Sequence, residues 1–143
     1  MFLNNNTGFR SVLFLAVLVL LCCGCGRSAL RVSRMAQPEY PLDAREHNIQ
    51  GDVVVGVQIG IDGTVLWTHT SGNSVLAVAA GDNARKWTWG PFPPRFEFPA
   101  YHEVLYRYRL EGHDACVDGQ PPTVKTDLPE IVEIIAPPCH PSF

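Results

Sequence analysis

The chain has 143 residues, of which 46% are hydrophobic and 12 are prolines, and its formal net charge is −3. This length fits one domain with a modest hydrophobic core. Because charge is sparse and slightly negative, no basic surface argues for a nucleic-acid partner.

Residues 1–26 read as a targeting segment and not as part of the fold. Arg10 precedes an uncharged apolar run from Val12 to Cys25, shorter than the roughly 20 residues of a membrane-spanning helix. Three interpretations stay open: a signal peptide cleaved after Gly26, a lipoprotein signal with Cys25 as the acylated lipid anchor, and an uncleaved membrane anchor. All three place the domain outside the cytoplasm, and the last two attach it to a membrane.

Residues 27–36 form a short connector to the domain proper. The segment from Pro38 to Gln50 predicts a turn and then a short helix with Pro41 at its first position. Tyr40 and Pro41 are expected to pack over one end of the domain.

A β-hairpin comes next. Hydrophobic residues alternate from Val53 to Ile61, which predicts a strand with one buried face. Asp62-Gly63 favours a tight turn, and the β-branched segment Thr64–Thr70 predicts the returning strand. Together these elements form the centre of the predicted sheet.

The register of this hairpin has two solutions. A strict two-residue loop pairs Val57 with Thr68 and puts Trp67 near Gln58 on the opposite face, where Gly56 leaves room for an indole. A β-bulge would reverse this parity.

A change of period predicts a helix after the hairpin. Asn73 or Ser74 can cap its first turn. Apolar residues then recur at helical spacing and end in a large aromatic residue: Leu76, Ala80, Ala84 and Trp87. Prolines from Pro91 onward end the helix. We expect Trp87 to bury against the hairpin.

The segment His102–Leu110 predicts a third strand with alternating faces. Its arginines and Glu103 share one face, and its tyrosines share the other. Residues 113–143 form a Pro-rich tail, within which Ile131–Ile135 is able to add a short fourth strand.

No catalytic motif or cofactor-binding motif is present, so neither an enzyme nor a cofactor is expected. Cys116 and Cys139 are the only cysteines beyond the targeting segment, and an even pair in an exported domain predicts a disulfide. A zinc site with His113 and His140, or free thiols, are the alternatives. A metal is not expected, because two ligands adjacent in sequence are unusual geometry for zinc.

The whole pattern resembles the C-terminal domain of the TonB family. The residues that carry the resemblance are Tyr40-Pro41, Ala44, Ile49, Gly51, Asp62-Gly63, Gly72, Leu76, Ala79-Ala80 and Trp87-Thr88-Trp89, followed by the late strand. The resemblance covers residues 37–112. It implies a small α+β fold, with a three-stranded antiparallel sheet and two helices on one face.

The resemblance also implies a function. A TonB-like domain captures an extended segment of an outer-membrane transporter as an added strand, in TonB-dependent transmembrane transport. The receiving edge would be the late strand: His102, Glu103, Val104, Leu105, Tyr106, Arg107, Tyr108 and Arg109. Its two arginines would select acidic neighbours in the incoming segment. A homodimer is also compatible with the sequence.

The alternative is a structural envelope lipoprotein without energy coupling. Two departures from the transducers favour it: the connector is short, and the apolar run contains no histidine. In that case the fourth strand, held by the disulfide, would cover the late strand.

Overall fold

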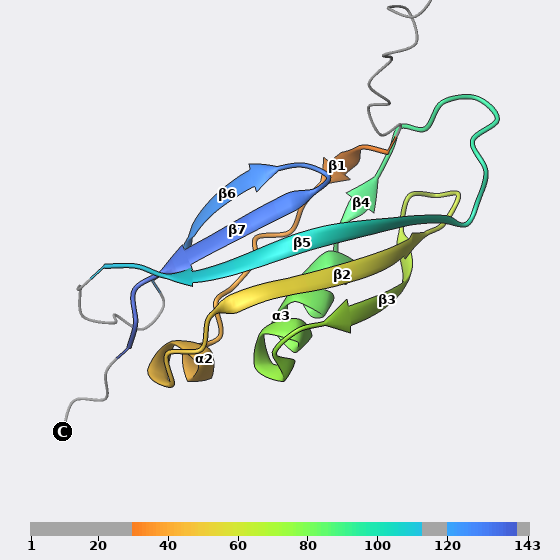
Figure 1. Ribbon diagram of the computed structural model, residues 1–143. Helices are drawn as coiled ribbons and strands as arrows, with labels where there is room; N and C mark the ends of the chain where they lie inside the picture. The colour runs from red at the N-terminus through yellow and green to blue at the C-terminus, as the bar shows by residue number, and fades with distance from the viewer. Residues whose placement is uncertain (1–29, 113–119, 140–143) are drawn as a thin grey trace, which may run out of the picture.

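The computed structural model describes residues 30–112 and 120–139. In chain order its elements are β1 (Val32–Arg34), α2 (Leu42–Glu46), β2 (Gly51–Ile59), β3 (Val65–Ser71), α3 (Ser74–Arg85), β4 (Thr88–Trp89), β5 (Ala100–Leu110), β6 (Thr123–Asp127) and β7 (Ile131–Ala136). The short strands β1 and β4 pair with each other, and the remaining strands form the main sheet (Figure 1).

The main sheet has five strands in the order β3-β2-β5-β7-β6. Neighbouring strands are antiparallel except for β5 and β7, which are parallel. The α+β class is therefore right, but the predicted three-stranded antiparallel sheet is wrong. The three predicted strands do not include the tail after residue 112. In the structure, the tail forms the hairpin β6–β7, which adds two strands to the sheet beside β5.

The β2–β3 hairpin follows the register of the strict loop through most of its length. Val57 lies opposite Thr68 and Gln58 opposite Trp67, with an irregularity only after Gln58. In the turn, Asp62 Oδ1 accepts hydrogen bonds from the Thr64 amide at 3.0 Å and the Thr64 hydroxyl at 2.7 Å. These bonds lower the pKa of the Asp62 carboxyl, the hydroxyl having the larger effect.

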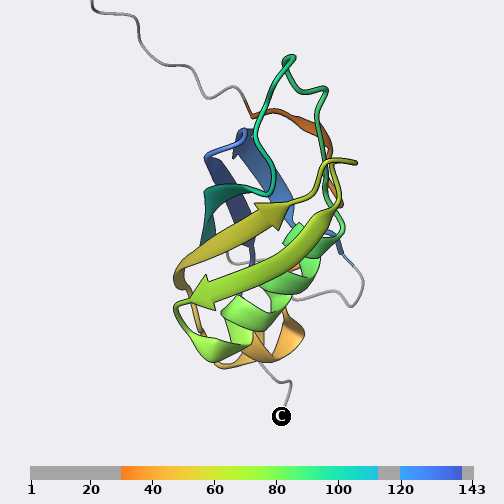
Figure 2. The ribbon, with the colours of Figure 1, turned by 90° about the vertical axis from the view of Figure 1, so that its right-hand side faces the viewer.

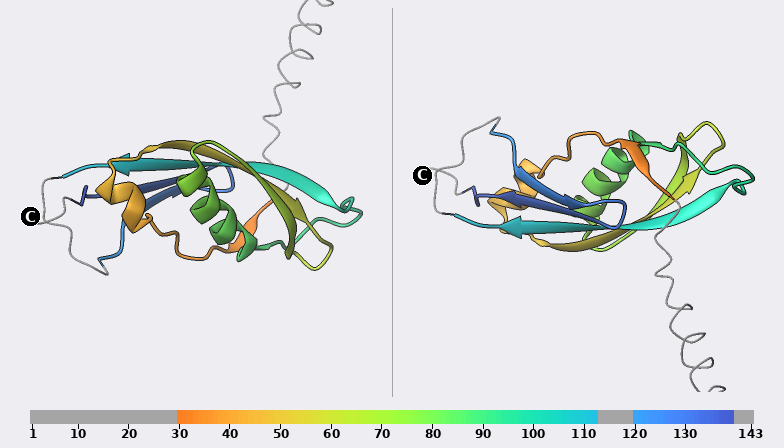
Figure 3. Two further views of the ribbon diagram at one scale, coloured as in Figure 1. Left: turned by 90° about the horizontal axis from the view of Figure 1, so that it is seen from below. Right: turned by 90° about the horizontal axis from the view of Figure 1, so that it is seen from above.

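Both helices lie on the same face of the main sheet (Figures 2 and 3). Asn73 caps α3, because its Oδ1 accepts from the Val75 amide at 3.0 Å. The helix-side face carries the core: Val53, Val55, Val57 and Ile59 of β2, Val104, Tyr106 and Tyr108 of β5, and Val132 and Ile134 of β7, against Leu76, Ala80 and Ala84 of α3. We call the opposite face of the sheet the outer face.

Trp87 is buried on the helix side, where it is 2% exposed. It lies just beyond the end of α3, and its ring centroid is 6.0 Å from that of Tyr106. The Asn83 side chain holds this cluster together: its Oδ1 accepts from Trp87 Nε1 and from the Tyr106 hydroxyl, both at 2.9 Å. Its amide nitrogen donates to the Ala36 carbonyl at 3.0 Å, so the buried polar atoms of Asn83 are satisfied.

Candidate functional site

Strand β5, which contains the predicted partner-binding residues, has neighbours on both sides. From Ala100 to Tyr108 it pairs with β2. On its other side β7 pairs with Leu105–Leu110 in parallel register (Figure 1). The prediction of a free edge is therefore wrong from Leu105 to Arg109, because the apolar segment 131–136 occupies that position.

The first part of β5 remains open on the β7 side. The Leu105 amide donates to the carbonyl of Glu130, in the turn between β6 and β7, at 2.8 Å. Since amide directions alternate along a strand, the Glu103 amide points the same way, and within the described ranges no strand pairs with it there. The His102 Nε2 atom lies 3.2 Å from the Pro129 carbonyl oxygen, so the opening is short.

The side chains of β5 divide as the sequence indicates. Val104, Tyr106 and Tyr108 are fully buried on the helix side and present no surface to a partner. Burial raises the pKa of both tyrosines above their usual value. Only the other face of the strand is available to bind anything.

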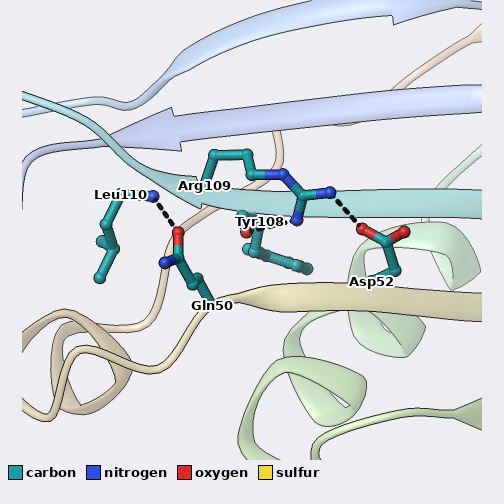
Figure 4. A network of polar contacts seen from close by, with 5 residues as sticks. All are labelled: Gln50, Asp52, Tyr108, Arg109 and Leu110. Carbon is teal, nitrogen blue, oxygen red and sulfur yellow. Dashed lines mark hydrogen bonds and ion pairs between the residues drawn. The ribbon is translucent and has the colours of Figure 1, made fainter.

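Arg109 is engaged within the domain. Its guanidinium lies 2.7 Å from Asp52 Oδ1 and 3.1 Å from the Tyr108 carbonyl oxygen. Beside it, the Leu110 amide donates to Gln50 Oε1 at 3.1 Å (Figure 4). Selection of acidic segments by Arg109 would have to compete with its own Asp52.

The last described residues of the tail, 137–139, are fixed to α2. Arg45 Nε donates to the Pro137 carbonyl at 2.9 Å, and the Cys139 amide donates to the Arg45 carbonyl at 3.2 Å. Cys139 is 3% exposed. Cys116, with which we expect it to pair, lies outside the described residues, as do His113 and His140 of the alternative zinc site.

A hollow of about 550 Å³ opens on the outer face where β3, β2 and β5 lie side by side. It is lined by Gly56, Val57, Trp67, His69, Tyr101, His102 and Glu103. The rings of Trp67 and His69 are nearly parallel, with centroids 5.9 Å apart. The Tyr101 hydroxyl accepts from Gln58 Nε2 at 2.8 Å, which orients the third ring.

Sequence reasoning located only part of this hollow. The expected position of Trp67 beside Gln58 is confirmed. Tyr101 and Glu103 were missed there, because they face the same space only through the register that sets Gln58 opposite Tyr101 and Gly56 opposite Glu103.

One group of possible metal ligands occurs among the described residues. Donor atoms of Asp43, Glu46 and His47 lie within 4.8 Å of one another, and all three residues are exposed. His47 Nδ1 donates to the Asp43 carbonyl oxygen at 2.8 Å, and this hydrogen bond is the main cause of the raised pKa of the imidazole. This is an ordinary pairing along one turn of helix, and it carries no metal proposal.

The targeting segment and its candidate lipid anchor Cys25 lie outside the described residues. Within residues 30–112 and 120–139, the helices are all too short or too polar to cross a membrane.

Comparison with known protein families identifies the class of this domain. The family described as Gram-negative bacterial TonB protein C-terminal matches residues 36–110, which is more than half of the chain. No curated protein and no solved structure matches. The matched range ends with β5, so the hairpin β6–β7 lies beyond it. The family match and the arrangement of β2, β3, α3 and β5 agree: this chain belongs to the TonB C-terminal family.

Proposed function

We propose that this protein is a structural envelope protein with a TonB-like interaction domain, and that its own C-terminal hairpin fills the edge at which an extended peptide would be captured. Family membership supports a TonB-like protein-interaction role in the envelope, facing the periplasm. The pairing of β7 with Leu105–Leu110 is the observation that carries the proposal. A strand already paired on both sides offers no backbone groups to an incoming strand.

The hairpin is part of the core and not a loose cover. Val132 and Ile134 are fully buried, and Ala136 is 2% exposed. Opening the edge would expose these side chains to water, at about 1.5–3 kcal/mol for each large one. A free peptide would also compete with a strand of the same molecule, whose effective concentration is high.

The second candidate function is capture of an outer-membrane transporter segment after the hairpin moves aside. It is favoured by the extent of the family match, which ends at residue 110 and so contains β5 without its cover. The two candidates differ in one requirement: only capture needs β7 to leave β5.

A disulfide that locks β7 onto β5 tests this requirement. Arg107 and Glu133 are partners in the parallel register, and adjacent strands are about 4.8 Å apart, within the range that a disulfide spans. We expect the double variant Arg107→Cys/Glu133→Cys to restore envelope integrity, measured as detergent resistance, to a deletion strain as well as the wild type does. Uptake through TonB-dependent transporters should be the same in the deletion strain and in the deletion strain that carries the locked variant as in the parent strain.

Each single cysteine variant is the control for loss of the native side chain. If deletion abolishes transporter-dependent uptake, and if the locked variant restores uptake only after a reductant is added, then the hairpin must move. The capture function would then replace the structural one.

A second prediction concerns the cysteines. We propose that Cys116 and Cys139 form a disulfide, which would fix the tail beside α2 and remove about 3 kcal/mol of loop entropy from the unfolded chain. The mature protein, unfolded without reductant, should therefore resist thiol-alkylating reagents at both positions, as measured by mass spectrometry. Labelling at either cysteine, or zinc in the same sample, would contradict the disulfide.

A further inference from the structure

The aromatic hollow on the outer face lies outside the hydrophobic core. Trp67 is 55% exposed and Tyr101 is 67% exposed, and both stand on the face opposite the helices. The core is complete on the other side of the sheet without them. Large apolar side chains gathered in one exposed place are typical of interaction sites.

The floor of the hollow is open because residue 56 is a glycine. A Cβ built at Gly56 would meet no atom closer than the His69 carbonyl oxygen at 3.8 Å, an ordinary contact. Packing therefore does not require glycine here, and glycine within a strand is unfavourable relative to alanine because it loses more conformational freedom on folding. Glycine in this setting is typical of a backbone that another group approaches closely.

Charge distinguishes this end of the outer face from the other. At the far end, Asp52 pairs with Arg109 at 2.7 Å, and Glu133 pairs with Lys125 at 3.9 Å. Glu103 has no cation within salt-bridge distance among the described residues, and the lining of the hollow contains neither Lys nor Arg. The hollow therefore combines aromatic rings with an unpaired carboxylate.

We propose that the hollow binds an arginine side chain presented by a protein partner. The guanidinium group is planar, so it stacks on an aromatic ring such as that of Trp67 while its N–H groups donate to the Glu103 carboxylate. Protein interfaces concentrate their binding energy in Trp, Tyr and Arg. The site lies on a face of the sheet and not on an edge, so it is independent of whether β7 leaves β5.

NMR titration of the ¹⁵N-labelled protein tests the proposal, with acetyl-arginine methylamide as the probe and acetyl-citrulline methylamide as its uncharged counterpart. We expect the arginine probe to shift the amide signals of Gly56 and Glu103 and the indole signal of Trp67. The citrulline probe should bind at least about threefold more weakly, since it lacks the charge.

Three variants locate the site. Glu103→Gln should weaken binding about three- to fivefold, and the matched control Glu133→Gln, at the far end of the same face, should not. Gly56→Val fills the floor and should abolish the shifts while the melting temperature stays equal or rises, which separates loss of the site from loss of the fold.

The proposal is overturned if both probes bind equally, if Glu133→Gln weakens binding as much as Glu103→Gln, or if the shifts lie elsewhere. It is also overturned if soluble glycan fragments shift these signals when arginine does not. Signals that change only with protein concentration would assign the hollow to a second copy of this chain instead. None of these outcomes affects the hairpin-locking experiment, which concerns β5 and β7.

Discussion

Trp87→Ala should lower the free energy of unfolding by about 3–5 kcal/mol, a large part of the stability of so small a domain. The substitution leaves a cavity beneath the sheet, because the indole is 2% exposed and packs against Tyr106 and Trp89. It also removes one of the donors that satisfy Asn83 Oδ1. Urea denaturation followed by far-UV circular dichroism measures the effect as a lower midpoint.

Trp67→Ala is the matched control. It removes the same side chain from the outer face, where 55% of the residue is exposed. We expect a change within about 0.5–1 kcal/mol, as for surface positions in general. Equal losses for both tryptophans would contradict the assignment of the core to the helix side of the sheet.

Arg107→Pro should destabilise the domain by about 3 kcal/mol or more, although the side chain it replaces lies on the outer face. The Leu105 amide donates toward the hairpin, so the Arg107 amide, two residues further along, points the same way. Proline cannot donate this hydrogen bond, and its ring would crowd β7. The urea midpoint and the protection of β7 amides against hydrogen exchange should both fall.

Glu103→Pro is the control on the same strand. The Glu103 amide points in the same direction, but the pairing of β7 begins only opposite Leu105. This variant should fold with a loss within about 1 kcal/mol. If β5 accepted proline equally well at both positions, β7 would not be paired with it in solution, and the structural role proposed for the hairpin would fail.

Local patterns in the sequence were sufficient for the longer elements of the family domain. They did not predict the short strands β1 and β4, and the helix ends at Arg85, before Trp87, and not at the prolines from Pro91 onward. Alternation defines β2, the Asn73 cap marks the start of α3, and the two faces of β5 follow from its charged and aromatic residues. The apolar run Ile131–Ile135 also forms a strand, as its composition indicates. These features depend on residues close together in sequence, where propensity and periodicity operate.

The features that could not be predicted depend on contacts between segments that are far apart in the sequence. Nothing within Ile131–Ile135 determines that it runs parallel to β5, since direction depends on how β6 returns the chain. Strand β6 itself, Thr123–Asp127, is mostly exposed and has no alternating apolar pattern to reveal it. The hollow likewise requires the pairing of Gly56 with Glu103, which joins residues far apart in the chain.

Because β6 and β7 follow β5 in the chain, the β5 edge is formed before the hairpin that covers it. A polypeptide emerges from its amino end, so β2, β3, α3 and β5 leave the ribosome or the export channel before β6 and β7 do. During that interval the backbone groups of Leu105–Leu110 that face β7 in the folded domain have no strand to pair with. The β5 edge that β7 covers in the folded protein is therefore exposed in every nascent chain. The time needed to synthesise the residues from β5 to β7 determines how long this exposure lasts.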